Sequence, residues 1–286
     1  NYGTGEVRCE APQITPESTA TKPSEVYKPG ATLDRTLEYG GKTVPIYRDR
    51  PLNVFSDVDF IWTGEENENQ RRLEYLGGEF RTRYGIDVSS FQGEIDWDAV
   101  ADDNIDFAMV RVGFRGTGTG SLNTDKYYEQ NIRGAMRAGL ETGVYFFAQA
   151  VTVEEAIEEA DYVISLLDGL DINGPVAYDW EMHDSTYRVY GTSPEMATAC
   201  AVAFCERIKD AGYTPMVYGG TYVTYMKYDQ GALADYLSWY PEYKSEKSEK
   251  LCPTLVYHMD YWQFSSSRAV AGINGRVDMN IQFIRR

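Results

Sequence analysis

The chain has 286 residues, of which 43% are hydrophobic, so it can bury the core of one large domain or two modest ones. Its formal net charge of −17 argues against nucleic acid, which needs clusters of Lys and Arg, and against an anionic membrane surface. No apolar run is long enough to span a bilayer, so we expect no membrane insertion, and we expect a monomer.

The first 83 residues differ in composition from the rest. Residues 1–35 are rich in Pro, Thr, Ser, Glu and Lys and lack periodicity, which predicts a linker or tail. The chain begins without Met and reads as trimmed sequence, which is compatible with export. Residues 36–83 predict an N-terminal extension packed on the main domain, with a short strand pair within 42–55 and a short helix within 67–78, ended by Gly77.

Beyond residue 84, short apolar runs alternate with helical stretches. The predicted strands are 84–89, 106–114, 143–150, 174–180, 215–220, 236–240, 258–265 and 275–280. The predicted helices lie near 125–138, 152–168 and 194–211; Thr152 begins the second, and Ser193 with Pro194 begins the third. This alternation predicts parallel strands joined by right-handed crossovers. We therefore expect an α/β fold, an irregular (β/α) TIM-like barrel over 84–286 that loses its helices toward the end.

The four cysteines give no metal or redox motif. Cys9, Cys200, Cys205 and Cys252 form no CxxC pair and have no histidine cluster nearby, so a zinc site is not expected. Cys200 and Cys205 lie five apart on a predicted helix, about 8.5 Å between Cα atoms, which is too far for a mutual disulfide. Another pairing and free buried thiols both remain open.

Acidic residues lie at or near the ends of several of the predicted strands, at the edge where a β/α barrel carries its active site. In "GPVAYDWEMHD" (174–184), Asp179 and Glu181 are two apart and point to the same face, with Cα atoms about 6.6 Å apart. Asp87 and Asp278 carry weaker signals, since each alone could cap a turn. A solvated strand end or a structural ion pair is the alternative for the Asp179 and Glu181 pair. If the acids meet in one cleft, their titrations should split.

The same strand ends carry aromatic and basic residues, from which we predict a substrate-binding set: Arg111, Tyr145, Tyr218, Trp239 and Trp262. Acids together with aromatic rings are typical of glycoside chemistry, because one carboxylic acid protonates the leaving oxygen and a second group stabilises the anomeric carbon. No metal and no cofactor is needed. The chain has two histidines, and His183 either lines the cleft or lies on the surface.

Three segments resemble the signature segments of the glycoside hydrolase family 25 lysozymes. They are "YGIDVSSFQGEIDW" (84–97), "YDWE" (178–181) and "YWQFSSSRAVAGINGRVDMN" (261–280), in the order and spacing of that family. The resemblance covers about residues 84 to 283. It implies an irregular β/α barrel and a muramidase that cleaves the β-1,4 bond between N-acetylmuramic acid and N-acetylglucosamine in peptidoglycan. A peptidoglycan substrate implies an exported protein, extracellular or associated with the cell wall.

The resemblance also implies roles for single residues. Glu181 matches the general acid, Asp179 the acid beside it, and Asp87 and Asp278 two further acids of the same cleft. Tyr218 and Trp239 match sugar-contacting aromatics less securely, and Gln149 stands where polar residues vary. The spacing of Asp179 and Glu181 favours a substrate-assisted route with retention, in which Asp179 assists the 2-acetamido group of the sugar.

Three alternatives remain open. A chitinase-like glycosidase of another barrel family would carry further acids before the pair, where this chain has Val176, Ala177 and Tyr178. A catalytically inactive cell-wall-binding module would not need all four cleft acids. A structural or adhesive surface protein carrying the barrel as one part would not clear a peptidoglycan suspension.

Overall fold

An eight-stranded closed barrel forms the centre of the computed structural model, which describes residues 20–30, 32–64 and 71–286. The barrel strands, in hydrogen-bonded order, are β5 (Phe80–Val88), β6 (Phe107–Arg115), β8 (Glu141–Ala148), β9 (Val176–Trp180), β10 (Pro215–Tyr218), β11 (Leu237–Pro241), β12 (Tyr261–Arg268) and β13 (Val277–Arg285). β13 pairs with β5 and closes the barrel. The predicted irregular barrel is confirmed, and each of the eight predicted strands overlaps one of these.

The direction of the last strand differs from the prediction. The other seven barrel strands run parallel to one another, but β13 is antiparallel to both of its neighbours, β12 and β5. The short connection from β12 to β13, residues 269–276, holds no helix and cannot carry the chain back across the barrel. The expectation of an all-parallel barrel is therefore wrong at this strand. As a consequence, the beginning of β13 lies beside the C-terminal end of β5.

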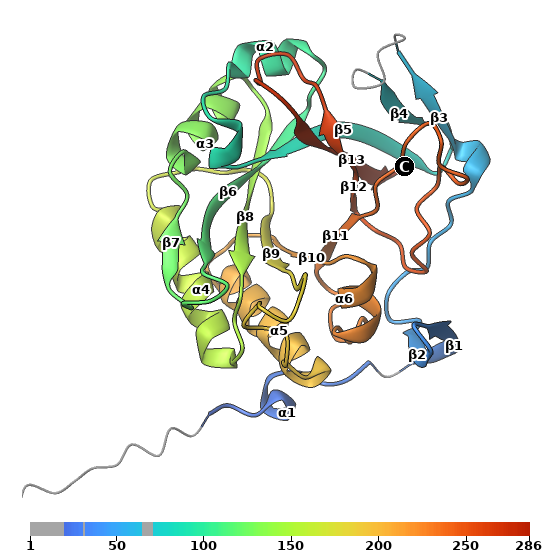
Figure 1. Ribbon diagram of the computed structural model, residues 1–286, viewed down its shortest axis with the longest axis vertical. Helices are drawn as coiled ribbons and strands as arrows, with labels where there is room; N and C mark the ends of the chain where they lie inside the picture. The colour runs from blue at the N-terminus through green and yellow to red at the C-terminus, as the bar shows by residue number, and fades with distance from the viewer. Residues whose placement is uncertain (1–19, 31, 65–70) are drawn as a thin grey trace, which may run out of the picture.

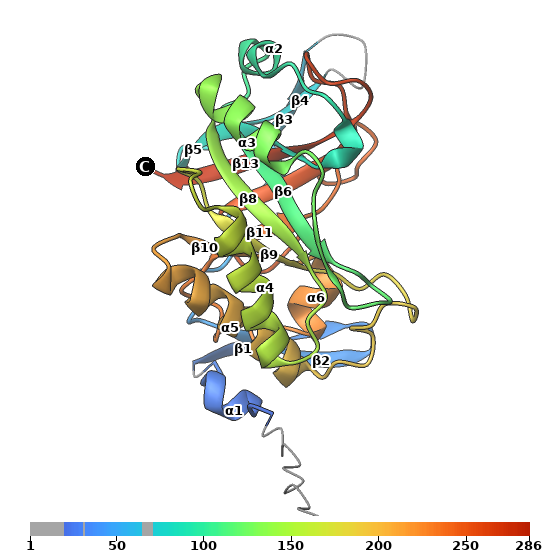
Figure 2. The ribbon, with the colours of Figure 1, turned by 90° about the vertical axis from the view of Figure 1, so that its left-hand side faces the viewer.

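Helices cover one side of the barrel. They are α2 (Trp97–Asp102), α3 (Tyr128–Arg137), α4 (Val153–Leu166), α5 (Pro194–Asp210) and α6 (Thr221–Met226), and a short strand, β7 (Leu122–Thr124), pairs with β6. Figures 1 and 2 show α3, α4 and α5 packed outside β6, β8 and β9. The predicted starts are confirmed, because the Thr152 and Ser193 hydroxyls accept from the backbone N–H groups of Glu155 and Met196. Every residue of β9 is buried, as expected of a strand covered on both faces.

Of the residues before the barrel, the earlier ones (20–30 and 32–47) pack against α5 and α6, whereas residues 55–64 and 71–75 cover the side that has no helices. Together they form α1 (Pro23–Val26), the antiparallel pair β1 (Leu33–Tyr39) and β2 (Lys42–Tyr47), the 3-10 turn Asp57–Asp59, and the antiparallel pair β3 (Phe60–Thr63) and β4 (Arg72–Tyr75). Phe60 packs edge-on against Trp262 of β12, with ring centroids 5.4 Å apart, and Phe55 lies 4.4 Å from the ring of Phe283 on β13. These rings shield the apolar outer faces of β12 and β13 from water.

The predicted helix within 67–78 is wrong. Arg72–Tyr75 is strand β4, and residues 65–70 lie outside the described residues. Leu73 is fully buried and Tyr75 packs against Phe60, so alternate side chains turn toward the barrel with the period of a strand. Pairing with β3 outweighs the helical propensity of the Arg–Leu–Glu sequence.

The structure also bears on the state of the cysteines and on the expectation of no membrane insertion. Cys200 and Cys205 are free, buried thiols in α5, and Cys252 is a half-buried free thiol; Cys9 lies outside the described residues. Within the described ranges, none of the helices is both long and apolar enough to cross a bilayer.

Candidate active site

The predicted acids and aromatics meet at one end of the barrel, where the parallel strands end. In the strand register, Asp179 of β9 lies opposite Tyr218 of β10, which in turn lies opposite Trp239 of β11. Asp278, at the beginning of the antiparallel β13, lies opposite Asp87 on β5. The reversed strand thus brings its first acid to the same end as the acids that close the parallel strands.

These residues surround a cavity of about 200 Å³, named here the acid pocket. It is lined by Asp87, Ser89, Phe91, Gln92, Arg111, Tyr145, Phe147, Asp179, Glu181, Tyr218, Trp239, Tyr243, Gln263 and Asp278. All four predicted acids are present, and so are four of the five predicted substrate-binding residues: Arg111, Tyr145, Tyr218 and Trp239.

Trp262 is the exception, and its prediction as a substrate-binding residue is corrected. The side chain is fully buried and packs against Phe60 and Phe264 on the outer face of the barrel. Its indole N–H donates to the backbone carbonyl of Glu242 at 3.0 Å. Side chains alternate along a strand, so Trp262 points away from the cavity that its neighbour Gln263 lines.

Asp87 is held in the floor of the acid pocket by two amide side chains. Gln263 Nε2 and Asn280 Nδ2 both donate to its Oδ2 atom, at 2.9 and 2.8 Å. The indole N–H of Trp239 in turn donates to Asn280 Oδ1 at 2.8 Å, and the Tyr218 hydroxyl donates to Gln263 Oε1 at 3.1 Å. Two predicted sugar contacts therefore also fix the orientation of the amides that hold Asp87.

Burial and mutual repulsion shift the titration of the pocket acids. Burial raises the pKa of Asp87 to about 6, although its hydrogen bonds to Asn280 and Gln263 oppose the shift. Burial, with the negative charge of Asp87, raises the pKa of Asp278 to about 8, and the two carboxyl groups share a hydrogen bond. Burial and then the charge of Glu181 raise the pKa of Asp179 well above its ordinary value. The raised pKa of Asp278 favours its protonated form up to about pH 8.

Because the pKa of Asp278 is raised, we expect the free energy of unfolding to depend on pH. The folded protein holds this proton more tightly than the unfolded chain, so the stabilisation is complete below the ordinary carboxyl pKa and is lost as the pH rises through about 8. Each proton released contributes a slope of about 1.4 kcal/mol per pH unit. We expect Asp278→Asn to flatten the fall in unfolding free energy between pH 5 and pH 9, measured by urea denaturation.

The matched control is Asp102→Asn, which removes an exposed carboxyl from α2. It changes the net charge by the same amount, so it corrects for general self-repulsion of this acidic protein. Equal pH slopes for Asp278→Asn, Asp102→Asn and the unmodified protein would contradict the prediction.

Glu181 lies one residue beyond the end of β9, with its side chain 24% exposed. It borders both the acid pocket and a second cavity of about 620 Å³, named here the outer hollow. The outer hollow is lined by Glu181, Met182, His183, Tyr190, Tyr218, Gly220, Thr221, Tyr222, Val223, Pro241 and Tyr243. His183 lies on the surface and also lines this hollow, and its Nε2 atom is 2.6 Å from Glu181 Oε2. The carboxyl group of Glu181 thus stands where a small acidic cavity meets a larger aromatic one.

The structure adds pocket residues that the sequence reasoning did not select. Gln263 has a signal in the sequence, because it stands two residues from Tyr261 and so faces the barrel interior with it, and Asn280 is related to Asp278 in the same way. Phe91 and Tyr243 come from connections after β5 and β11, for which periodicity gives no signal. Among the described residues, no group of three or more His, Cys, Asp or Glu side chains is arranged to hold a metal ion.

Arg111 lines the acid pocket, and its guanidinium group forms an ion pair with Asp125. Its guanidinium contacts Asp125 Oδ2 at 2.9 Å from Nε and 2.8 Å from a terminal nitrogen. It also lies over the ring of Phe91, 5.1 Å from the centroid, and Phe91 is 85% exposed at the mouth. The ion pair fixes the arginine, which in turn supports an exposed aromatic ring beside the acids.

Comparison with known proteins shows the family of this chain. The family model described as glycosyl hydrolases family 25 matches residues 86–273. The chain is 26% identical to the autolytic lysozyme of Clostridium acetobutylicum over 197 residues, which are 68% of this chain and 54% of that protein. It is 27% identical to lysozyme M1 of Streptomyces globisporus over 201 residues, 68% of this chain and 66% of that protein. The chain thus spans about half the length of the clostridial relative.

Solved structures show the same fold. The bacterial lysozyme from Streptomyces coelicolor aligns with a TM-score of 0.56 at 25% identity, covering 69% of this chain and 90% of that chain. The Clostridium perfringens spore cortex lytic enzyme SleM aligns with a TM-score of 0.60 at 22% identity, covering 70% of this chain and 67% of that chain. The family model spans more than half of the chain and includes the segments that carry Asp87, Asp179 and Glu181, so the resemblance read from the sequence is confirmed. This protein belongs to glycosyl hydrolase family 25.

Proposed function

We propose that this protein is a peptidoglycan hydrolase that cleaves the β-1,4 bond between N-acetylmuramic acid and N-acetylglucosamine. The observation that carries the proposal is the position of Glu181 between the acid pocket and the outer hollow. A glycosidase must protonate the oxygen between two sugars while a second carboxyl group stabilises the donor sugar. A chain threaded through both cavities would present that oxygen to Glu181. Lysozymes among its relatives support the choice of substrate.

In this proposal, Glu181 is the general acid and later the general base. The donor sugar, whose C1–O bond breaks, occupies the acid pocket above Asp87, and the leaving sugar occupies the outer hollow. The aromatic rings of Tyr218 and Tyr243 border both cavities and support the apolar faces of the two sugars. Tyr145 and Trp239 form the wall beside the donor sugar, with their rings edge to face at 5.8 Å.

Asp179 assists the 2-acetamido group of the donor sugar. Within the described residues, its Oδ1 atom is buried and has no hydrogen-bond partner, so an acetamide N–H would satisfy it. In the unliganded protein, burial and then the charge of Glu181 raise the pKa of Asp179 well above its ordinary value, which favours its protonated form. We propose that this proton passes to Glu181 when the acetamide binds, because the two carboxyl groups share a hydrogen bond. Glu181 then holds the proton that the leaving oxygen needs, and Asp179 holds the negative charge that stabilises the oxazolinium ion.

The direct test is to incubate purified protein with peptidoglycan, reduce the new ends with borohydride and identify the sugar. Cleavage as proposed leaves N-acetylmuramic acid at the reducing end, which is recovered as its alditol. N-acetylglucosamine at the reducing end would contradict the bond assignment. Release of soluble fragments from chitin but not from peptidoglycan would support the chitinase-like alternative.

A cell-wall-binding module without activity is the remaining candidate from another class. It would retain peptidoglycan in a pull-down assay but would generate no reducing ends. The four acids gathered in one cavity favour catalysis, because a sugar-binding site gains nothing from several neighbouring carboxyl groups, two of them buried, that repel one another.

We also propose that the protein is exported, because peptidoglycan lies outside the cytoplasmic membrane. The Pro-, Thr- and Ser-rich residues 11–30 are compatible with this location. Fractionation of the native source tests it: recovery of the protein from the cytosol alone would contradict export.

A further inference from the structure

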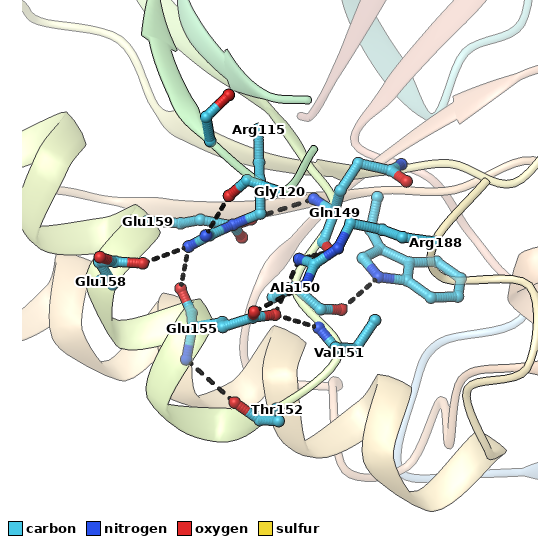
Figure 3. A network of polar contacts seen from close by, with 12 residues as sticks. Arg115, Gly120, Gln149, Ala150, Val151, Thr152, Glu155, Glu158, Glu159 and Arg188 are labelled. Atoms are coloured by element: carbon cyan, nitrogen blue, oxygen red, sulfur yellow. Dashed lines mark hydrogen bonds and ion pairs between the residues drawn. The ribbon is translucent and has the colours of Figure 1, made fainter. Parts of the chain in front are cut away.

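We propose that Gln149 is a positioning residue for the acid Glu181, and that the buried pair Glu159 and Arg115 holds Gln149 in place. This inference rests on the proposed function of Glu181. Gln149 Nε2 donates to the backbone carbonyl of Glu181 at 2.8 Å, and Gln149 is fully buried. Figure 3 shows the network of polar contacts around Gln149: Glu159 and Arg188 bond to its backbone, and Arg115 bonds to Glu159.

The hydrogen bond from Gln149 to Glu181 lies just beyond the last paired residues of β8 and β9. The last pair between β8 and β9 is Ala148 with Trp180, so Glu181 has no partner in the ladder. The side chain of Gln149, the first residue beyond β8, replaces the missing ladder contact. The next residue acts in the same way, since the carbonyl of Ala150 accepts from the indole N–H of Trp180 at 3.1 Å. The backbone on which the acid is mounted is therefore fixed by the segment that follows β8.

Gln149 is itself anchored through both of its backbone polar groups. Its N–H donates to Glu159 Oε1 at 3.0 Å, and its carbonyl accepts from Arg188 at 2.8 Å. Arg188 is held in turn by the carboxylate of Glu155, at 2.7 and 2.9 Å (Figure 3). These contacts leave the Gln149 backbone little freedom, so the direction of its side chain is set in advance.

Glu159 is an unusual residue to find at this position on α4. It is fully buried, its second oxygen, Oε2, has no hydrogen-bond partner among the described residues, and burial raises its pKa to about 7. Arg115, at the end of β6, donates to Glu159 Oε1 at 2.7 Å and also to the carbonyl of Gly120 at 2.8 Å. A buried ion pair of this kind adds little stability over apolar side chains of the same volume. The pair instead holds Gln149 in place, because Glu159 Oε1 accepts hydrogen bonds both from Arg115 and from the backbone N–H of Gln149.

The side chain of Gln149 likewise contributes little to stability. Within the described part of the chain, its one hydrogen bond goes to Glu181, and its Oε1 atom is buried without a partner. Gln149→Met keeps the length of the side chain and removes both the donor and the unpartnered oxygen. A structural role predicts a lower melting temperature for this variant. A positioning role predicts an unchanged or higher melting temperature together with a loss of turnover.

The test measures kcat and KM on soluble peptidoglycan fragments. We expect Gln149→Met to lower kcat by about 10- to 100-fold with little change in KM, because misplacing the acid weakens the transition state more than substrate binding. The matched control is Gln230→Met, which removes another buried glutamine amide, one that bonds to Arg50 away from the acid pocket. It should lower stability and leave kcat unchanged.

A double-mutant cycle separates positioning from general damage. If Gln149 acts through Glu181, Gln149→Met costs nothing further in a Glu181→Gln background. Equal losses in both backgrounds, or a kcat within twofold of the unmodified protein, would overturn the proposal.

A second measurement does not need activity. Hydrogen exchange of peptides covering residues 178–184 should accelerate in Gln149→Met and stay unchanged in Gln230→Met. If the unmodified protein shows no turnover, the proposed function fails, while this exchange measurement still decides whether Gln149 holds the segment. Unchanged exchange in Gln149→Met would overturn the positioning role by itself.

Discussion

Replacing Glu181 by glutamine is expected to lower kcat on peptidoglycan by about 100- to 10,000-fold, the usual contribution of a general acid. Gln has the same shape, but its amide cannot give a proton to the leaving oxygen. The fold should be unaffected, because Glu181 lies beyond the end of β9 and its side chain is partly exposed. Gln can still accept a hydrogen bond from His183, whose Nε2 is 2.6 Å from the carboxyl group. Release of new reducing ends measures the effect.

The matched control for this substitution is Glu38→Gln, which alters an exposed glutamate on β1. It should keep full activity and the same melting temperature. Turnover by Glu181→Gln within a few fold of the unmodified protein would contradict the role of Glu181 as the acid. Loss of activity together with a large fall in melting temperature would contradict the claim that the fold is independent of this carboxyl group.

The regular part of the barrel could be predicted because its local signals agree. Buried strands read as short apolar runs, and Thr152 and Ser193 with Pro194 start the helices at the predicted positions. The rule that barrel sites lie at strand ends then brought Asp179, Glu181 and Asp87 together correctly. Those residues depend on local sequence and on one topological rule.

The predictions that are wrong concern segments whose structure depends on contacts with residues distant in the sequence. The direction of β13 depends on a short connection and on closure against β5, and neither leaves a periodic signal. The prediction that Trp262 binds substrate rests on its residue type and ignores the alternation of side chains along β12. Its neighbour Gln263 faces the barrel interior and bonds to Asp87. The segment Arg72–Tyr75 has helical propensity, yet it pairs with β3 and covers the outer face of the barrel. Tertiary packing overrides propensity at each of these places.

Replacing Asp179 by asparagine should lower kcat by about 100- to 1,000-fold while substrate binding persists. Asn keeps the shape of a residue that is only 6% exposed, but it can neither pass a proton to Glu181 nor carry the negative charge. Asp184→Asn is the matched control, since this exposed carboxyl bonds to Thr186 and lines neither cavity. Binding is measured by co-sedimentation with peptidoglycan, and a parallel loss of binding and turnover would contradict the assigned role.

The stereochemistry of the first product decides how Asp179 acts. Assistance by the acetamide involves two inversions at the anomeric carbon, so the initial product keeps the β configuration. Proton NMR at early times, before the sugar mutarotates, distinguishes the two anomers. An initial α-anomer would reject retention and turn Asp179 into the base that activates water. A substrate with a free amine in place of the donor acetamide separates the remaining possibilities. Its cleavage should be abolished if the acetamide oxygen attacks the anomeric carbon; cleavage at the normal rate would reject acetamide participation and leave Glu181 as the acid.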